Sequence, residues 1–237
     1  MSQSTGLDFA RFEVLTFDCY GTLIDWETGI LGALRSMLSN GAAEATDDEL
    51  LEAFADAEAA LEAGPWRPYR QVLARAAQAV AARFGSLLDE PTAALFGGSV
   101  VEWPAFPDAA PSLRRLAQRY ELGVITNCDD DLFAASNRLL GEPFRWVVTA
   151  EQVRSYKPAP RHFEVALQRI EPPPERVLHV AQSLYHDHVP ARQLGLATAW
   201  VDRRAGRGGF GATPPATATP DLACPDMATF TQLALAS

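Results

Sequence analysis

One carboxylate stands where a buried strand is expected to run out into a turn. Residues 12–17 (FEVLTF) form an apolar run, and Asp18 follows it in the segment FDCYGTLID, 17–25. An ionised carboxylate at such a point can act as a nucleophile that is transiently esterified. The residue two positions later is Tyr20, so the turn lacks the second acid that a hard, oxygen-seeking Mg²⁺ site favours.

Polar and charged side chains also follow the later apolar runs of the chain. In an open parallel sheet the reactive crevice lies outside the carboxyl ends of the strands. We therefore expect these side chains to gather around Asp18: Thr126, Asn127 and Cys128 after 121–126, Lys157 in the loop after 145–150, and Gln182, Ser183 and Asp187 after 177–181.

The elements that position these residues alternate along the chain. The apolar runs are rich in Val, Leu and Ile without clean alternation, as in strands covered on both faces. Helical segments lie between the later runs, and this order predicts an α/β fold with a parallel sheet and right-handed crossovers. We expect strands at 12–17, 121–126, 145–150, 177–181 and 196–201, and helices at 111–119, 130–141, 161–170 and 188–195.

The region 27–103 is different, because it is alanine-rich and helical almost throughout. Its helical stretches are 29–39, 47–64, 69–85 and 91–101. We interpret 27–103 as a helical insert after the first strand, with 1–26 and 104–237 forming the core and the Pro-rich 102–111 as the return linker. The Gly- and Pro-rich stretch 204–220 is expected to be a long flexible loop before a last short element.

Composition excludes several classes of partner. The 237 residues carry a formal net charge of −10, which argues against nucleic acid and anionic membranes. No long uncharged apolar segment predicts a membrane span, and the N-terminal MSQSTGLDFARFE lacks the pattern of a secretory signal. The scattered cysteines Cys19, Cys128 and Cys224 indicate reduced thiols, and we expect a cytoplasmic protein.

Taken together, the motifs resemble those of the haloacid dehalogenase superfamily. DCYGTLID is similar to its first motif, VITN to its second, SYKP to its third and VAQSLYHD to its fourth. The resemblance implies a Rossmann-like core with an all-helical cap inserted after the first strand, and Asp18 as nucleophile. Tyr20 and Gln182 stand where the phosphatases of the superfamily carry acids. The chain therefore looks like the metal-independent branch, similar to type II (S)-2-haloacid dehalogenases, with no cofactor.

The resemblance also implies a mechanism and a substrate. Asp18 would displace halide from carbon 2 of a short 2-haloalkanoic acid, and water would hydrolyse the ester to the 2-hydroxy acid with inversion. Lys157 would keep Asp18 charged, since a Lys–Asp pair about 4 Å apart gains roughly 4 kcal/mol at an effective dielectric of about 20. Asp187 would position the water, and Thr22 would bond to Asp18.

The substrate itself would be bound by further residues of the strand ends and the cap. Thr126, Asn127, Ser183 and the backbone N–H groups of Cys19 and Tyr20 would receive its carboxylate or the halide. The stretch 50–66 lacks the arginine that clamps halide in the family, so the leaving group stays open between the usual halides and fluoroacetate or azetidine-2-carboxylate types. The candidates for its binding are Trp66, Arg67, Tyr69, Arg70 and His186.

Each of these residues also has an ordinary structural interpretation. Lys157 would suit a surface salt bridge, Asp187 a helix N-cap, and Ser183 a turn. His179 is expected to be structural, and Cys19 and Cys128 lack a visible base partner. Two other functions stay open, a Mg²⁺-dependent phosphatase and a non-catalytic binder on the same fold. Relatives often dimerise, which suggests a homodimer.

Overall fold

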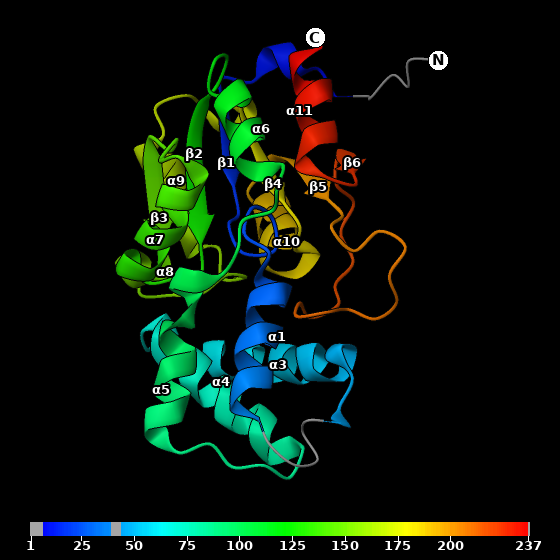
Figure 1. The fold of residues 1–237 in the computed structure, drawn as a ribbon. Coiled ribbons are helices and arrows are strands. Elements are labelled where there is room, and N and C mark those ends of the chain that lie inside the picture. The colour runs from blue at the N-terminus through cyan, green and yellow to red at the C-terminus, as the bar shows by residue number, and fades with distance from the viewer. Residues whose placement is uncertain (1–6, 39–43, 237) are drawn as a thin grey trace.

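The computed structural model describes residues 7–38 and 44–236, and its centre is a six-stranded parallel sheet. The strands are β1 Val14–Phe17, β2 Glu121–Thr126, β3 Trp146–Thr149, β4 Val177–Ala181, β5 Ala197–Val201 and β6 Leu222–Cys224. Their order across the sheet is β3-β2-β1-β4-β5-β6 (Figure 1). The predicted parallel α/β core is confirmed, and β6 is the one strand that the sequence patterns did not reveal.

β1 lies at the switch point of the sheet, because the chain passes to β2 on one side and to β4 on the other. Phe17 pairs in register with Val124 of β2 and with Val180 of β4. All four residues of β1 are buried. Ligands of open α/β sheets bind at such a switch point, outside the carboxyl ends of the strands. Asp18, the next residue, therefore stands at the favoured edge.

Helices cover both faces of the sheet. On one face α9 Arg161–Arg169 and α10 Val189–Gln193 pack through Phe163 and Ala191 against Val14. The other face is covered by α6 Ala109–Leu116, α7 Asp130–Leu140 and α11 Met227–Leu235, which pack through residues such as Leu113 and Phe230. A short helix, α8 Ala150–Val153, follows β3.

A group of helices follows β1 and lies beyond the carboxyl ends of the strands, below the sheet in Figure 1. These cap helices are α1 Trp26–Met37, α3 Asp47–Glu62, α4 Tyr69–Arg83 and α5 Glu90–Gly98, followed by a 3-10 turn, Ser99–Glu102. Asp25 caps α1, and Thr46 and Glu49 form a reciprocal capping box on α3. The helical nature of the insert is confirmed, while the limits 27–103 remain a prediction.

The stretch 204–220 is a loop whose residues 211–213 are buried, whereas 205–210 are exposed. Ala212 is buried and Thr213 is 7 % exposed, with its hydroxyl donating to Gln182 Oε1 at 3.3 Å. The expected helix end at Ser39 and the first six residues of the N-terminal stretch lie outside the described residues. Within 7–38 and 44–236, no helix is long and apolar enough to cross a membrane.

Candidate active site

Asp18 is bonded to the side chain of Lys157, which is the only lysine in the chain. The Lys157 ammonium donates to Asp18 Oδ1 at 2.8 Å, to Asp187 Oδ1 at 2.6 Å and to the Ile125 carbonyl at 2.9 Å. Its side chain is 1 % exposed, so the surface salt bridge interpretation is wrong. Three residues from different strand ends thus meet, with the ammonium between two carboxylates.

Asp187 is turned toward this lysine, and not toward the helix that follows it. The N-cap of α10 is His188, so the N-cap interpretation of Asp187 is wrong. Asp187 Oδ1 lies 3.0 Å from His179 Nε2, and His179 Nδ1 lies 3.0 Å from Thr16 Oγ1. Because a carboxylate only accepts, Nε2 carries the proton and Thr16 donates to Nδ1. Burial lowers the pKa of His179 to about 3, so a neutral ring orients Asp187.

Thr22 fixes the second oxygen of the nucleophile. Its hydroxyl donates to Asp18 Oδ2 at 2.8 Å and accepts from the Gln182 N–H at 2.9 Å. Arg203 donates to the Thr22 carbonyl at 2.9 Å and forms a bidentate pair with Asp108 at 3.0 and 2.9 Å. Such a fork is geometrically restrictive. Arg203, which sequence analysis missed, therefore holds the turn that carries Asp18.

One ammonium serves two buried carboxylates, and the pKa shifts reflect this. Burial raises the pKa of Asp18, although Lys157 and Thr22 oppose the rise. Burial also raises the pKa of Asp187. Burial by itself lowers the pKa of Lys157, but the two carboxylates outweigh it and the pKa is raised. Sequence analysis expected the lysine to keep Asp18 charged; in the structure the lysine limits a rise of the Asp18 pKa that desolvation causes.

Asn127 acts on the backbone of Lys157. Its Oδ1 accepts from the Lys157 N–H at 2.7 Å, and its Nδ2 donates to the Lys157 carbonyl at 3.0 Å. Asn127 also lines the cavity described below, so it both borders the substrate space and positions the lysine. Thr126, by contrast, is buried and does not line the cavity, and its predicted role in substrate binding is not supported by its placement.

Tyr20 fills space at the nucleophile but turns its hydroxyl away. The hydroxyl lies 3.1 Å from Ser136 Oγ and accepts from Cys128 Sγ at 3.3 Å, while the ring borders the cavity. The backbone N–H groups of Cys19 and Tyr20 make no hydrogen bond within the described part of the chain. Tyr20 lines the cavity, so its N–H is available to a ligand, whereas Cys19 is buried and does not line the cavity. Burial raises the pKa of both Cys19 and Cys128, so neither is a thiolate nucleophile.

A small cavity of about 30 Å³ lies over Asp18 between the sheet edge and the cap. Eight predicted site residues line it: Asp18, Tyr20, Tyr69, Asn127, Lys157, Ser183, His186 and Asp187. The remaining wall consists of Trp26, Glu58, Glu62 and Thr213.

His186 presents an unbonded nitrogen to this cavity. Ser183 Oγ accepts from the His186 N–H at 2.8 Å and lies 3.2 Å from His186 Nδ1. If the hydroxyl donates to Nδ1, the ring proton is on Nε2. That Nε2 is buried without a hydrogen-bond partner among the described residues. Burial lowers the pKa of His186 to about 3, so the ring is neutral.

Two glutamates of α3 face the nucleophile, and sequence analysis missed both. Glu58 is 2 % exposed and accepts from the Tyr69 hydroxyl at 2.7 Å. Burial raises the pKa of Glu58 to about 7 and, together with the Glu58 charge, raises the pKa of Glu62 well above its ordinary value. Their signal in the sequence was the spacing of four and eight residues from the buried Phe54, which places all three on one helix face.

Of the leaving-group residues predicted in the cap, Tyr69 alone lines the cavity over Asp18. Trp66, Arg67 and Arg70 do not line the cavity over Asp18. The Asp129 carboxylate accepts from the N–H groups of Tyr69 at 2.7 Å and Arg70 at 3.0 Å. This anchor turns the start of α4 so that Tyr69 enters the cavity. Arg70 points outward, and its guanidinium pairs with the exposed Asp131 at 2.5 Å.

The other two side chains are held on the rim of the cap. Arg67 donates to the Leu61 carbonyl at 3.4 Å, and the Trp66 ring lies under the guanidinium of Arg154, 3.8 Å from its centroid. Arg67 and Arg70 do not line the cavity over Asp18, whereas Trp66 lines a neighbouring pocket together with Glu62 and Lys157. Contact of these residues with the leaving group remains a prediction.

The residues around Asp18 do not fit a divalent cation. Tyr20 directs its hydroxyl to Ser136, and the Lys157 ammonium stands between Asp18 and Asp187, where an ion bridging the two carboxylates would have to bind. Over residues 7–38 and 44–236, no group of three His, Cys, Asp or Glu residues is arranged to hold a metal. The donor set favours chemistry by the carboxylate itself.

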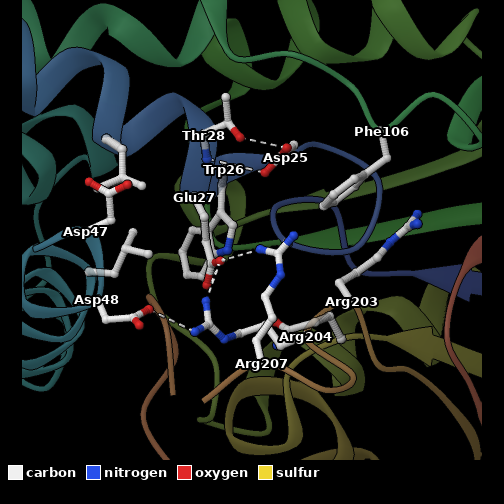
Figure 2. Close-up of a pocket in the computed structure, with 14 residues that line it drawn as sticks. Asp25, Trp26, Glu27, Thr28, Asp47, Asp48, Phe106, Arg203, Arg204 and Arg207 are labelled. Atoms are coloured by element: carbon white, nitrogen blue, oxygen red, sulfur yellow. Dashed lines mark hydrogen bonds and ion pairs between the residues drawn. The ribbon is translucent and has the colours of Figure 1, made fainter. Parts of the chain in front are cut away.

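The packed loop after β5 ties the cap to the core at a second pocket (Figure 2). Arg204 donates to Glu27 of α1 at 2.6 Å and to Asp48 of α3 at 3.1 Å. The Ala212 N–H donates to the other Glu27 oxygen at 3.2 Å. Gly211 has φ +65°, and a Cβ there would collide with Glu27. Only glycine allows this close approach.

We expect Arg204→Ala to lower the free energy of unfolding by about 1–3 kcal/mol, because Glu27 is left partly buried without its main donor. Urea denaturation measures the change. Arg207→Ala is the matched control, since Arg207 is 67 % exposed and only 3.9 Å from the same carboxylate, and it should have little effect. If the two variants lost equal amounts of unfolding free energy, the Arg204–Glu27 ion pair would have no specific role in holding the loop to the cap.

Comparison with known proteins places this site in a family context. A family model described as haloacid dehalogenase-like hydrolase matches residues 12–187. Haloacid dehalogenase-like hydrolase domain-containing protein 3 of Danio rerio is 31 % identical over 107 residues, which are 44 % of this chain and 44 % of that protein. The (S)-2-haloacid dehalogenase H-109 of Pseudomonas putida is 27 % identical over 155 residues, 64 % of this chain and 69 % of the relative. The match thus spans less than half of the first relative.

A solved structure is similar over nearly the whole chain. The L-2-haloacid dehalogenase of Xanthobacter autotrophicus with chloropropionic acid covalently bound has a TM-score of 0.77 at 20 % identity. The alignment covers 94 % of this chain and 98 % of that one. At this identity the likeness concerns the fold, and the chemistry has to be argued from the residues.

Proposed function

Because the chain belongs to the haloacid dehalogenase-like hydrolase family, we propose that it hydrolyses short alkanoic acids with a displaceable group on carbon 2, through an ester on Asp18. The 2-haloalkanoic acids are the first candidates, in keeping with the names of the relatives. The observation that carries the proposal is the buried Asp18–Lys157–Asp187 arrangement at the switch point of the sheet.

In the first step Asp18 attacks carbon 2 from the side opposite the leaving group. A carbon–oxygen bond forms, and the leaving group departs with the electron pair of its bond to carbon 2. Lys157 and Thr22 hold the carboxylate oxygens in place, so little reorganisation is needed. The N–H group of Tyr20, which makes no hydrogen bond in the described part of the chain, would receive the substrate carboxylate.

In the second step water attacks the carbonyl carbon of the Asp18 ester. Asp187, oriented by His179, accepts a proton from the water, and the Lys157 ammonium stabilises the oxyanion that forms. The bond between this carbon and the substrate oxygen breaks, and the product oxygen takes the proton from Asp187. Carbon 2 is attacked only once, so its configuration inverts. The product is the 2-hydroxy acid, and Asp18 keeps one oxygen from water.

Isotope labelling tests this route directly. A single turnover in H₂¹⁸O with EDTA present should leave one heavy oxygen in the peptide that contains Asp18, and none in the peptide that contains Asp187. Mass spectrometry of the digested protein provides both readings from one sample. Label in the product alone would mean that water attacks the substrate carbon directly, and the proposed route would then be abandoned.

Assays on the same protein preparation also distinguish the proposed function from two rival functions. A Mg²⁺-dependent phosphatase would hydrolyse a phosphomonoester only with the metal and would lose activity in EDTA. A non-catalytic binder would bind a small acid without incorporating oxygen. The homodimer and the cytoplasmic location remain predictions, and sedimentation velocity measures the first of them.

A further inference from the structure

A second and larger space lies directly beside the cavity over Asp18. That cavity measures about 30 Å³, which is room for about two water molecules. The neighbouring pocket measures about 430 Å³, and we call it the outer pocket. Glu62 and Lys157 line both spaces, so the two adjoin at these side chains. A substrate whose carbon 2 contacts Asp18 can therefore place a longer chain only in the outer pocket.

The walls of the outer pocket are mainly apolar. The C-terminal part of α3 contributes Ala59 and Ala63, and the segment that precedes α9 contributes Pro158 and Ala159. The Trp66 side chain forms a further part of the wall. An alkyl chain placed here removes apolar surface from water, which is favourable.

The polar side chains of the outer pocket that lack a partner can all donate a hydrogen bond. Trp66 Nε1 is buried and has no hydrogen-bond partner among the described residues. Within 7–38 and 44–236, the guanidinium of Arg154 and the hydroxyls of Ser155 and Tyr185 also make no hydrogen bond. A set of donors without matching acceptors suits an anion with several oxygens, such as a carboxylate.

Arg154 supplies the positive charge of this set. Its guanidinium lies over the Trp66 ring, 3.8 Å from the centroid, and pairs with no carboxylate in the described part of the chain. Arg154 is the C-cap of α8, with φ 57° and ψ 39°. Glycine and asparagine usually occupy this left-handed conformation, and other residues that adopt it are concentrated at ligand sites. The stack on Trp66 thus holds an unpaired cation at the wall of the outer pocket.

The other ionisable groups of the outer pocket do not oppose an anion. Burial raises the pKa of Glu62 well above its ordinary value, which favours the neutral carboxyl. The Glu62 oxygens each lie 3.3 Å from Asn127 Nδ2. The Lys157 ammonium is already shared by two carboxylates. The charge left to attract a ligand is therefore that of Arg154.

We propose that Arg154, with Trp66, binds a second carboxylate of the substrate, so that the preferred substrate is a dicarboxylic acid with its displaceable group on carbon 2. The inference rests on the proposed attack by Asp18 and adds a substrate class to it. The first carboxylate lies at the Tyr20 N–H, and the chain passes Glu62 into the outer pocket. The Asp18 oxygen bonds to carbon 2, the leaving group departs with its electron pair, and water hydrolyses the ester to a 2-hydroxy dicarboxylate.

The matched substrates are 2-chloroadipate and 2-chlorohexanoate, which differ only at the far end of the chain, where one has a carboxylate and the other a methyl group. We expect wild-type kcat/KM to be about tenfold higher or more for the dicarboxylate, as a hydrogen bond to a charged group contributes. The second carboxylate is bound equally in the ground state and the transition state, so the advantage should appear in KM. Equal or lower kcat/KM for 2-chloroadipate would overturn the proposal.

Substitution of the arginine tests its role directly. Arg154→Gln should lower the ratio of the two kcat/KM values about tenfold, and Arg154→Lys, which keeps the charge, should restore part of it. The matched control is Arg145→Gln, because Arg145 also stacks on a tryptophan, 4.7 Å from the Trp146 centroid, but lies at the start of β3 and does not line the outer pocket. The control should keep the wild-type ratio. The same ratio in wild type and Arg154→Gln would contradict the assignment.

Binding to inactive protein separates this inference from the proposed function. Calorimetry with Asp18→Asn should show about tenfold tighter binding of adipate than of hexanoate. Adding Arg154→Gln should remove this difference, while the thermal midpoint stays close to that of the parent. Equal binding of the two acids to Asp18→Asn would overturn the inference.

Ester formation on the wild-type protein distinguishes the two ways of failing. If an Asp18 ester forms with 2-chlorohexanoate and 2-chloroadipate has no advantage, the inference fails and the proposed function stands. No Asp18 ester with either acid would end both.

Discussion

Replacing Asp18 with asparagine is expected to lower kcat by about 10⁴-fold or more, as removal of a covalent nucleophile generally does. The amide lacks the negative oxygen that attacks carbon 2. It also replaces the Oδ2 acceptor of Thr22, or the Oδ1 acceptor of Lys157, by an NH₂ group. Product formation under single-turnover conditions, with intact-protein mass to detect an ester, measures the effect.

The control for this substitution is Asp89→Asn. Asp89 caps α5 through the Thr92 N–H, and asparagine caps helices equally well, so activity and stability should both be retained. If Asp18→Asn kept kcat within tenfold of the wild type, water would have to be the attacking group, and the ester mechanism would be wrong.

Lys157→Met should cost about 3–5 kcal/mol of unfolding free energy and abolish turnover, because it leaves two buried carboxylates without their cation. Urea denaturation at several pH values measures the loss. Burial already raises the folded-state pKa values of Asp18 and Asp187, and losing the lysine raises them further. Carboxyl groups with raised folded pKa values are destabilising above those values. The variant should therefore regain stability as the pH is lowered toward them.

The double substitution Lys157→Met with Asp187→Asn provides the control for this reasoning. It removes one of the two buried carboxylates that lack a cation in Lys157→Met. The double variant should therefore be more stable than Lys157→Met alone at neutral pH. A Lys157→Met protein with wild-type stability and the same pH dependence would mean that the ammonium does not compensate these carboxylates.

The core site was predictable because chain order determines it. Asp18, Lys157 and Asp187 each follow a buried strand, and parallel strands bring such positions to one edge. β2 and β4 have the predicted bounds, since their apolar runs are long and uninterrupted. β6 was not predictable in the same way, because its three residues, Leu222–Cys224, are too short to show a period.

The cap side of the site was not predictable to the same extent. Arg67 and Arg70 have the right charge for a halide and lie near the expected position, but the Asp129 carboxylate fixes the start of α4 so that Tyr69 enters instead. Glu58 and Glu62 look like ordinary solvent-facing acids of an alanine-rich helix. Only the packing of α3 over the sheet edge shows that they are buried opposite Asp18.

The burial of the chain's single lysine has a practical consequence for labelling. Amine-reactive reagents have no exposed lysine to modify while the fold is intact, so they are directed to the terminal amino group. Acylation of Lys157 then reports that the cap has separated from the sheet edge or that the chain has unfolded. The rate of that acylation, followed by peptide mass, is a built-in measure of how often the site opens to solvent.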